Sequence, residues 1–500
     1  MKQYLDSGLR NGGNLLKDWL IISKWWGWLP LGAGALAGVA LPPLGWPWLL
    51  WIALLPLWRF GPRGGALWGA AAVLVSHRWL LALHPLTWLG VPAVLSLPLV
   101  LLLLLICAAA AALLVALWCG LLQWLGPSRL SSACFAALLW GLTEVLLAKG
   151  PLFWLGLGAA ALPGDRPLAG LAAFGGAGLV AAVQLLISWL LWRGAWPLLL
   201  VALLVSHGLG ALALALNSDL GSSQKLQLEL VQPALPTRQK FEWQQQQQQR
   251  QLLEKGFRQA ERDGSVAVLL PEGALLEADK PEEAKTELEI GLLSGGFRRE
   301  GLDDRSSLLW FPAGAATAQN WLDKHRLVPL GEWVPGGEWL QWSGLSAVGG
   351  LQPGAASRLL VLPEPIGRLA AAICYEISDG EALARATSLG AEWLLTVANL
   401  DPYPIQLQKQ FISLAQLRAI ETGRWLVSVA NTGPTAVVDP SGGVMEVLPS
   451  QKAGISSIKI ERISKQTLYA RFTEKPLLIL LVISSLCCLR SNKSLRSDPL

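Results

Sequence analysis

The 500-residue chain is poor in charged residues. Only 15% of its residues are Asp, Glu, Lys or Arg and 53% are apolar, whereas a typical soluble domain has about 25% charged residues. The shortage is local, because residues 1–220 hold 11 basic and 5 acidic residues of a total of 75, and residues 79–128 hold none. This composition excludes a disordered chain and a single uniform domain. It predicts an apolar N-terminal half joined to a soluble domain.

Metal ligands and pairs of cysteines are also scarce. The four His are far apart in the sequence, so we predict no metal and no cofactor. Basic residues are scattered, which argues against binding of nucleic acid. Cys374 is the only one of six Cys in the charged part of the sequence, so it has no disulfide partner there. An unpaired Cys outside the cytoplasm is expected to be buried or chemically used.

The apolar stretches are long enough to cross a bilayer, which takes roughly 17–25 helical residues. We predict about eight spans, near residues 25–41, 44–58, 65–83, 91–117, 131–148, 169–192, 195–216 and 475–489. Basic residues concentrate at the ends of spans that would face the cytoplasm if the N-terminus is there. Both termini are then cytoplasmic. The predicted parts are a membrane domain (1–220), an extracytoplasmic domain (221–470), and a final span with a basic tail (471–500).

Within 221–470, short apolar runs alternate with polar segments. We predict strands at 226–231, 266–270, 308–311, 359–362, 369–374, 393–397, 425–430 and 436–438, and helices at 242–262, 282–289 and 405–422. Buried strands interleaved with helices favour a layered α/β domain.

Three reactive side chains lie at or near the ends of these strands, where α/β domains place their sites. Glu272 follows the strand at 266–270, Cys374 ends the strand at 369–374, and Lys324 precedes Glu332 by eight residues. Taken singly, each has an ordinary structural explanation as a turn carboxylate, a buried thiol or a surface charge. Together they favour acyl transfer through a thioester. Glu272 would accept the thiol proton, and Lys324 would lower the pKa of the thiol and stabilise the oxyanion.

The order Glu272, Lys324, Cys374, within the strings PEG, DKHRLVPLGEWVP and ICYE, resembles the carbon-nitrogen hydrolase (nitrilase) superfamily. With the spans on both sides and the strings RAIE and ANTG, the chain is similar to the apolipoprotein N-acyltransferases of bacterial inner membranes. The resemblance implies an αββα sandwich on the periplasmic side of a helical membrane bundle.

The resemblance also implies a ping-pong reaction. A fatty acyl chain from a phospholipid, typically phosphatidylethanolamine, would pass to Cys374 and then to the α-amine of a diacylglyceryl-cysteine apolipoprotein. Glu272 would be the general base and Lys324 the oxyanion stabiliser. Three residues would support the site by the same resemblance: Glu332, Tyr375 and Glu376. The family's early Lys-Trp pair reads Lys240-Phe241-Glu242-Trp243 here, which leaves Phe241 and Trp243 as candidate substrate-binding residues.

Two other functions remain open on the sequence. A membrane-tethered amidase of the nitrilase type would use the same three residues, with water resolving the thioester. A membrane scaffold or transporter would need no such residues, and the spans contain few of the intramembrane charges that transport sites use, Glu144 being the main one.

Overall fold

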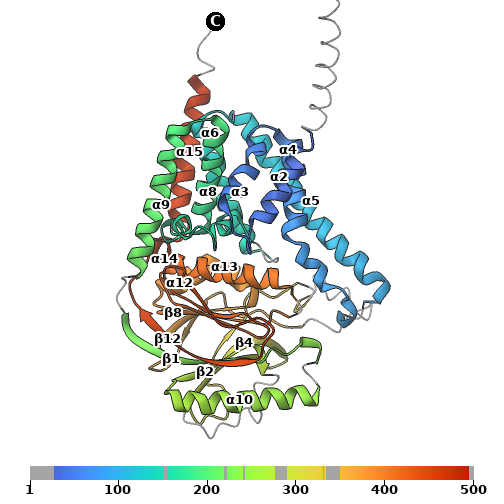
Figure 1. The fold of residues 1–500 in the computed structure, drawn as a ribbon, viewed down its shortest axis with the longest axis vertical. Helices are drawn as coiled ribbons and strands as arrows, with labels where there is room; N and C mark the ends of the chain where they lie inside the picture. Colours follow the sequence, from blue (N-terminus) through green and yellow to red (C-terminus); the bar gives the residue numbers. More distant parts are fainter. Residues whose placement is uncertain are drawn as a thin grey trace, which may run out of the picture.

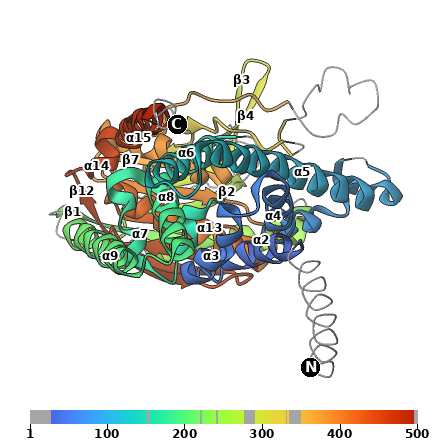
Figure 2. The same cartoon turned by 90° about the horizontal axis from the view of Figure 1, so that it is seen from above.

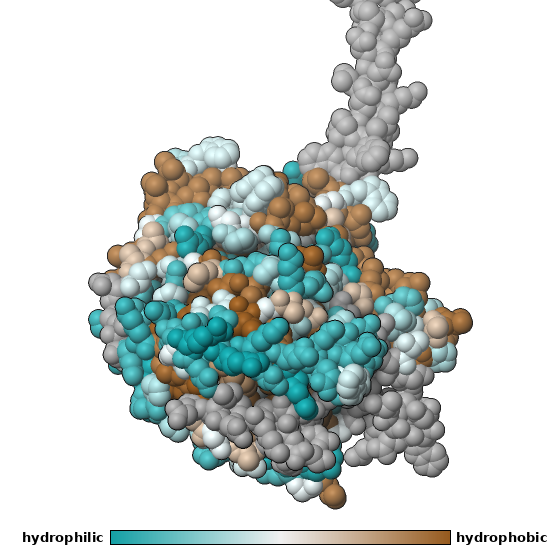
Figure 3. Space-filling model, turned by 60° about the horizontal axis from the view of Figure 1, so that its bottom comes forward, coloured by the Kyte–Doolittle hydropathy of each residue, from teal (hydrophilic) through white to brown (hydrophobic). Residues whose placement is uncertain are grey.

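The computed structural model describes residues 27–89, 91–150, 155–218, 222–239, 242–275, 290–329, 331–333, 350–401 and 403–494. The predicted helix at 282–289 and the candidate Phe241 lie outside these residues. A bundle of helices sits on one side of a layered α/β domain (Figure 1). Hydrophilic side chains cover much of the face formed by the α/β domain, and hydrophobic ones gather toward the bundle (Figure 3).

The bundle is built from the N-terminal half and the last helix. Its helices are α2 (Leu29–Ala40), α3 (Pro47–Ala53), α4 (Gly61–Ser76), α5 (Ala93–Leu125), α6 (Leu130–Ala148), α7 (Arg166–Ala169), α8 (Ala172–Arg193), α9 (Trp196–Ser218) and α15 (Lys475–Ser494). Short 3-10 turns connect them: η1 (Leu55–Trp58), η2 (Arg78–Leu83), η3 (Leu86–Leu89) and η4 (Leu157–Ala161). The first part of α5 projects sideways from the bundle, and its later part packs against α4 (Figures 1 and 2).

Four of the described helices, α5, α6, α8 and α9, are long and apolar enough to cross a membrane. The first predicted span contains the twelve residues of α2. The second is divided into α3 and η1, because Pro56 lacks an N–H and its ring clashes with the carbonyl four residues earlier. On α5 and α9 most apolar side chains face outward, as expected for helices that contact lipid.

The α/β domain contains two six-stranded sheets. The first has the order β12-β1-β2-β3-β4-β5 and the second β11-β10-β9-β8-β7-β6. The strands of the first sheet are β1 (Ser222–Gln232), β2 (Ala267–Leu275), β3 (Gly291–Glu300), β4 (Asp303–Phe311), β5 (Asn320–Asp323) and β12 (Gly454–Ile463). Those of the second are β6 (Leu359–Val361), β7 (Arg368–Ile373), β8 (Trp393–Ala398), β9 (Leu426–Ala430), β10 (Thr435–Val438) and β11 (Val444–Leu448).

The domain has the four layers that were predicted. In each sheet three central strands are parallel and the flanking pairs antiparallel. Helix α10 (Trp243–Asp263) packs against the first sheet, and α12 (Gly380–Ser388) and α13 (Ile405–Thr422) pack against the second. The two sheets contact each other through β2, β8 and β9. Because β2 and β7 belong to different sheets, Glu272 and Cys374 approach the site from the two sides of the sandwich.

Four strands were not predicted: β3, β5, β11 and β12. β3 and β12 alternate poorly, since β3 contains Ser294-Gly295-Gly296 and β12 carries several polar residues. β5 and β11 are short strands at the edges of their sheets. The predicted strand at 369–374 ends one residue earlier, because Cys374 begins the 3-10 turn η8 (Cys374–Ser378).

Helix α13 forms the floor on which the bundle rests (Figure 1). It is buried along almost its whole length between the second sheet and the bundle. Arg418 and Glu421 form an ion pair of 2.9 Å on this helix, and Glu421 accepts a hydrogen bond from the backbone N–H of Ala177, next to the kink of α8 at Gly175 and Gly176. The α/β domain is therefore attached to the bundle by buried polar contacts as well as by apolar packing.

A pair of glycines on α9 tests how tightly the bundle packs. A Cβ added at Gly210 would lie 1.8 Å from the carbonyl oxygen of Pro167, whereas one added at Gly208 would meet nothing within 4 Å. We expect Gly210→Ala to destabilise the detergent-solubilised protein by roughly 1–3 kcal/mol through overpacking. The matched control Gly208→Ala should leave the thermal unfolding midpoint unchanged or raise it, because Ala favours helices. Equal midpoints for the two variants would contradict this packing.

Candidate active site

Glu272 is presented by an irregularity near the end of β2. The register between β2 and β3 shifts between Leu270 and Leu275, and Gly273 has a φ of +62°, which favours glycine. The neighbouring strand also needs a glycine, because a Cβ on Gly295 would lie 2.5 Å from the Cα of Glu272. The Pro-Glu-Gly string thus bends the strand so that the Glu272 side chain leaves the sheet toward the second sandwich layer.

Lys324 directly follows β5, and its backbone N–H donates to the carbonyl of Ser306 at 2.8 Å. Its ammonium donates to Glu272 Oε1 and to Glu332 Oε1, both at 2.7 Å. The Lys324 side chain is only 1% exposed. Burial alone lowers the pKa of this ammonium, but the two carboxylates outweigh burial and hold its pKa well above the usual value. The charge is therefore permanent at any physiological pH.

The second carboxylate, Glu332, is held by the loop that it belongs to. Its Oε2 accepts a hydrogen bond from the backbone N–H of Val328 at 2.9 Å. Burial raises the pKa of Glu332, and the Lys324 ammonium opposes the rise. Because Glu332 shares the ammonium, Lys324 keeps a partner when Glu272 gains or loses a proton.

Cys374 stands at the end of β7 with a φ of +57°, which is unusual for a residue other than glycine. Such a turn projects the thiol from the sheet edge, and strain of this kind gathers at functional sites. The side chain is buried, and the Glu272 carboxylate is close enough to act on its charge. Burial and the negative charge of Glu272 hold the pKa of the Cys374 thiol well above its usual value, although Lys324 acts in the opposite direction. Lys324 thus acts in the predicted direction, but burial and Glu272 outweigh it, and the resting thiol is protonated.

Glu376 ties the three segments of the site together. It accepts hydrogen bonds from the backbone N–H groups of His325, Arg326 and Ile373 at 2.8–3.0 Å. It also forms an ion pair of 3.1 Å with Arg358, and both side chains are at most 3% exposed. One carboxylate thereby positions the residues that follow Lys324 and the residue that precedes Cys374.

Tyr375 links the same loop to the bundle. Its hydroxyl donates to the carbonyl of Leu327 at 2.9 Å, and the Arg326 guanidinium lies 4.6 Å from the centre of its ring. Arg326 in turn donates to Ser378 Oγ and to the carbonyl of Gly150, just beyond the end of α6. Burial raises the pKa of Tyr375 to about 12, so this hydroxyl stays protonated.

Two residues of the segment after β8 also belong to the site, although the sequence did not single them out. The backbone N–H of Asn399 donates to Glu272 Oε2 at 2.9 Å. Tyr403 packs edge-on against Trp79 of η2, with ring centres 5.6 Å apart. Burial, followed by the nearby charge of an ionised Cys374, raises the pKa of Tyr403. The rule that sites lie at strand ends could have indicated Asn399; nothing in the sequence indicated Tyr403.

The remaining candidate, Trp243, is the first residue of α10 and is 72% exposed. It stands apart from the buried cluster of Glu272, Lys324 and Cys374. The segment before α10 does reach the site, because Asn399 donates to Thr237 Oγ1 at 2.9 Å. Among the described residues, no group of three or more His, Cys, Asp or Glu could hold a metal ion.

The arrangement can carry out nucleophilic chemistry on a carbonyl group. The buried, protonated thiol of Cys374 is near the Glu272 carboxylate. The buried Lys324 ammonium donates to that carboxylate and to Glu332. Glu272 can remove the thiol proton as the thiolate attacks. Lys324 can stabilise the oxyanion that forms on the carbonyl oxygen.

Comparisons with known proteins agree on the superfamily. The carbon-nitrogen hydrolase family model matches residues 306–467. The chain is 48% identical over 453 residues to the apolipoprotein N-acyltransferase of Parasynechococcus marenigrum, covering 88% of this chain and 95% of that protein. It is 47% identical to the enzyme of that name from Prochlorococcus marinus strain MIT 9313, covering 90% and 93%.

Solved structures similar to this chain include two members of the nitrilase superfamily. Saccharomyces cerevisiae Nit3 is 16% identical, with a TM-score of 0.37 over 51% of this chain and 96% of that one. An amidase of Nesterenkonia is 17% identical, with a TM-score of 0.38 over 52% and 97%.

The Glu272 carboxylate raises the pKa of the Cys374 thiol, and it is also the group expected to remove the thiol proton. A substitution that removes the charge separates these two effects. In Glu272→Gln the negative charge that raises the pKa of the thiol is gone, so the thiolate should appear at lower pH and a small alkylating reagent should modify Cys374 faster near neutrality. Carbonyl chemistry should nevertheless fall by roughly 10²–10⁴-fold, because the base is lost. Alkylation of the Cys374 peptide against pH is measured by mass spectrometry, with the exposed Glu446→Gln as control. Slower alkylation in the variant would contradict the proposed electrostatics.

The buried ion pair of Glu376 should matter far more than an exposed one. Glu376→Ala leaves Arg358 buried without its partner, which should destabilise the protein by about 3–5 kcal/mol. On α10, Glu254 and Arg258 form an exposed pair of 3.4 Å, and the matched Glu254→Ala should cost roughly 0.5 kcal/mol or less. Thermal unfolding in detergent compares the two, and similar losses would show that the network around Glu376 does not stabilise the site.

Proposed function

The chain belongs to the apolipoprotein N-acyltransferase family of carbon-nitrogen hydrolases, and on that premise we propose that Cys374, Glu272 and Lys324 carry out its reaction with a phospholipid as acyl donor. The protein is an N-acyltransferase of bacterial membranes that acts on lipoproteins. The observation that carries the assignment of residues is the buried ammonium of Lys324, 2.7 Å from Glu272, whose carboxylate acts in turn on the buried thiol of Cys374.

In the first half-reaction Glu272 takes the proton of the Cys374 thiol, and the thiolate attacks the ester carbonyl of the phospholipid. The oxyanion of the tetrahedral intermediate is stabilised by Lys324. When the intermediate collapses, the C–O bond breaks, the glycerol oxygen takes the proton from Glu272, and a lysophospholipid leaves. The acyl chain stays on Cys374 as a thioester. Phosphatidylethanolamine is the donor we propose.

In the second half-reaction the α-amine of the diacylglyceryl-cysteine attacks the thioester carbonyl. Glu272 accepts the proton that the nitrogen loses, the C–S bond breaks, and the proton passes to the departing sulfur. The products are an amide and the free thiol. Glu332, Tyr375 and Glu376 support these steps by holding Lys324 and the turn at Cys374 in place.

Phe241 and Trp243 remain the candidate aromatic contacts of the substrate. The side chain of Trp243 is exposed, so a substrate can reach it.

The position of the domain suits lipid substrates. Burying a methylene is worth about 0.8 kcal/mol, so neither the donor nor the lipoprotein anchor leaves the bilayer readily. We propose about eight spans, with a membrane domain over residues 1–220, the catalytic domain over 221–470 on the periplasmic side, and a final span and tail over 471–500. Both termini then lie in the cytoplasm, as the distribution of basic residues favours.

Hydrolysis of an amide by a membrane-tethered nitrilase is the less supported alternative. The same three residues would serve it, with water in place of the amine. The curated relatives over nearly the whole chain are named N-acyltransferases, and an enzyme for a soluble amide has no need of a multi-helix bundle.

The thioester can be looked for directly. Purified protein incubated with phosphatidylethanolamine should gain the mass of one acyl chain on Cys374, and Cys374→Ala should gain none while still inserting and folding. Cys119→Ala, which removes another buried thiol, is the matched control and should keep the adduct. Addition of a diacylated lipopeptide should move the chain to the peptide amine. A folded wild-type protein without an adduct would refute the thioester, and release of free fatty acid alone would favour hydrolysis.

A further inference from the structure

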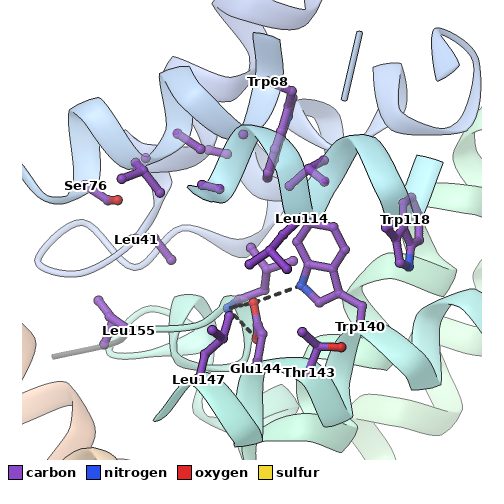
Figure 4. A pocket seen from close by; sticks show the side chains of 18 of the residues that line it. Leu41, Trp68, Ser76, Leu114, Trp118, Trp140, Thr143, Glu144, Leu147 and Leu155 are labelled. Atoms are coloured by element: carbon purple, nitrogen blue, oxygen red, sulfur yellow. Dashed lines mark hydrogen bonds between the residues drawn. The ribbon is translucent and has the colours of Figure 1, made fainter. Parts of the chain in front are cut away.

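The bundle contains an apolar cavity of about 260 Å³. Its wall comes from α2, α4, α5 and α6, and includes Leu114, Leu147 and Leu155 (Figure 4). On α6 the lining runs from Leu139 to Leu147, which at 1.5 Å per residue is a depth of roughly 12 Å. The lining therefore extends along the axis of α6.

Polar side chains in the wall are already paired within the protein. Glu144 accepts hydrogen bonds from the indole N–H of Trp140 and the backbone N–H of Leu157 at 2.8–2.9 Å (Figure 4). Thr143 donates to the carbonyl of Leu139 at 2.8 Å, and Ser76 lies 2.9 Å from His77 Nδ1. An apolar occupant would consequently leave none of these groups without a partner, and the cavity is suited to a hydrocarbon.

Three packed indole rings, those of Trp68, Trp118 and Trp140, form part of the cavity wall. Trp140 packs edge-on against Trp118 at 5.2 Å and against Trp68 at 6.0 Å between ring centres. Each indole N–H is hydrogen-bonded, Trp118 to the carbonyl of Ala136 and Trp68 to that of Ala53. Rings held by both packing and hydrogen bonds form a rigid wall rather than an adaptable one.

Another part of the lining adjoins the catalytic turn. The lining residues Leu147 and Leu155 flank the point where α6 ends at Ala148. The carbonyl of Ala148 accepts a hydrogen bond of 2.8 Å from Ser378, the last residue of the turn that begins with Cys374. On α4 the lining ends at His77, whose ring lies 6.1 Å from that of Trp79, the residue that packs against Tyr403.

We propose that this cavity receives the acyl chain carried by Cys374, and that the wall of Trp68, Trp118 and Trp140 determines the longest chain that fits. The inference rests on the proposed function, since it takes the thioester as given. A chain that enters beside the turn with its carbonyl at Cys374 would point its methyl end at the indoles. A rigid wall would then discriminate by length, and one methylene in an apolar pocket is worth about tenfold or more in selectivity.

The selectivity test uses two tryptophans of the same helix. Trp118 is buried in the wall of the cavity, whereas Trp124 is 70% exposed and does not line the cavity. Wild-type protein, Trp118→Leu and Trp124→Leu are incubated with an equimolar mixture of myristoyl, palmitoyl and stearoyl phosphatidylethanolamines, and the Cys374 adducts are compared by mass spectrometry. Trp118→Leu should raise the proportion of the stearoyl adduct by about tenfold relative to wild type, and Trp124→Leu should not change it. Identical profiles for all three proteins would overturn the proposal.

A second measurement does not depend on the reaction. Cys374→Ala protein is mixed with a phosphatidylethanolamine that carries a photoreactive group at the end of one acyl chain, and cross-linked peptides are identified. Labels on the inner face of α5 and α6, at residues such as Trp118 and Trp140, support the cavity as the acyl site. Labels confined to outward-facing residues of α5, such as Leu102 and Leu105, overturn it. If wild-type protein forms no adduct but the inner face is labelled, the thioester has failed and the cavity has not.

Discussion

The arrangement of the site depends on one buried cation. The Lys324 ammonium is withdrawn from water, which is tolerable only with opposite charge and hydrogen bonds around it. Glu272 and Glu332 supply both, each at 2.7 Å. The ion pair with Lys324 fixes the position of Glu272 on the distorted end of β2. The ion pair with Glu332 fixes the loop that follows β5. At the Cys374 thiol, the effect of the Glu272 carboxylate on the pKa exceeds that of the Lys324 ammonium.

That confinement has a consequence for the chemistry. Because burial and the charge of Glu272 raise the pKa of the Cys374 thiol, the thiol rests in its protonated form, and in the proposed reaction it becomes a thiolate only when Glu272 takes the proton. Lys324 remains charged throughout, so its electrostatic contribution is available when the oxyanion develops.

The same turn joins the chemistry to the membrane. Glu376 fixes the backbone on both sides of the site, and Ser378 and Arg326 bond to carbonyls at and beyond the end of α6. α6 is also one wall of the apolar cavity. The turn that begins with Cys374 and the apolar cavity are thus both in contact with α6, which is the arrangement that the proposed acyl site needs.

Local features of the sequence were enough to predict the apolar half, the layered α/β domain and the three reactive residues, because charge depletion, short buried runs and strand-end motifs are properties of neighbouring residues. Several features depended on contacts between distant segments. The strands β3 and β12 were missed because neighbouring strands, not their own patterns, stabilise them. Lys324 lowers the pKa of Cys374 as predicted, but the net rise was not predicted, because burial in the folded domain and the charge of Glu272 outweigh Lys324. The sequence also did not predict the contacts of Tyr403, of Arg358 or of the three packed indoles. Each of these contacts joins residues that are far apart in the chain and meet only in the folded protein.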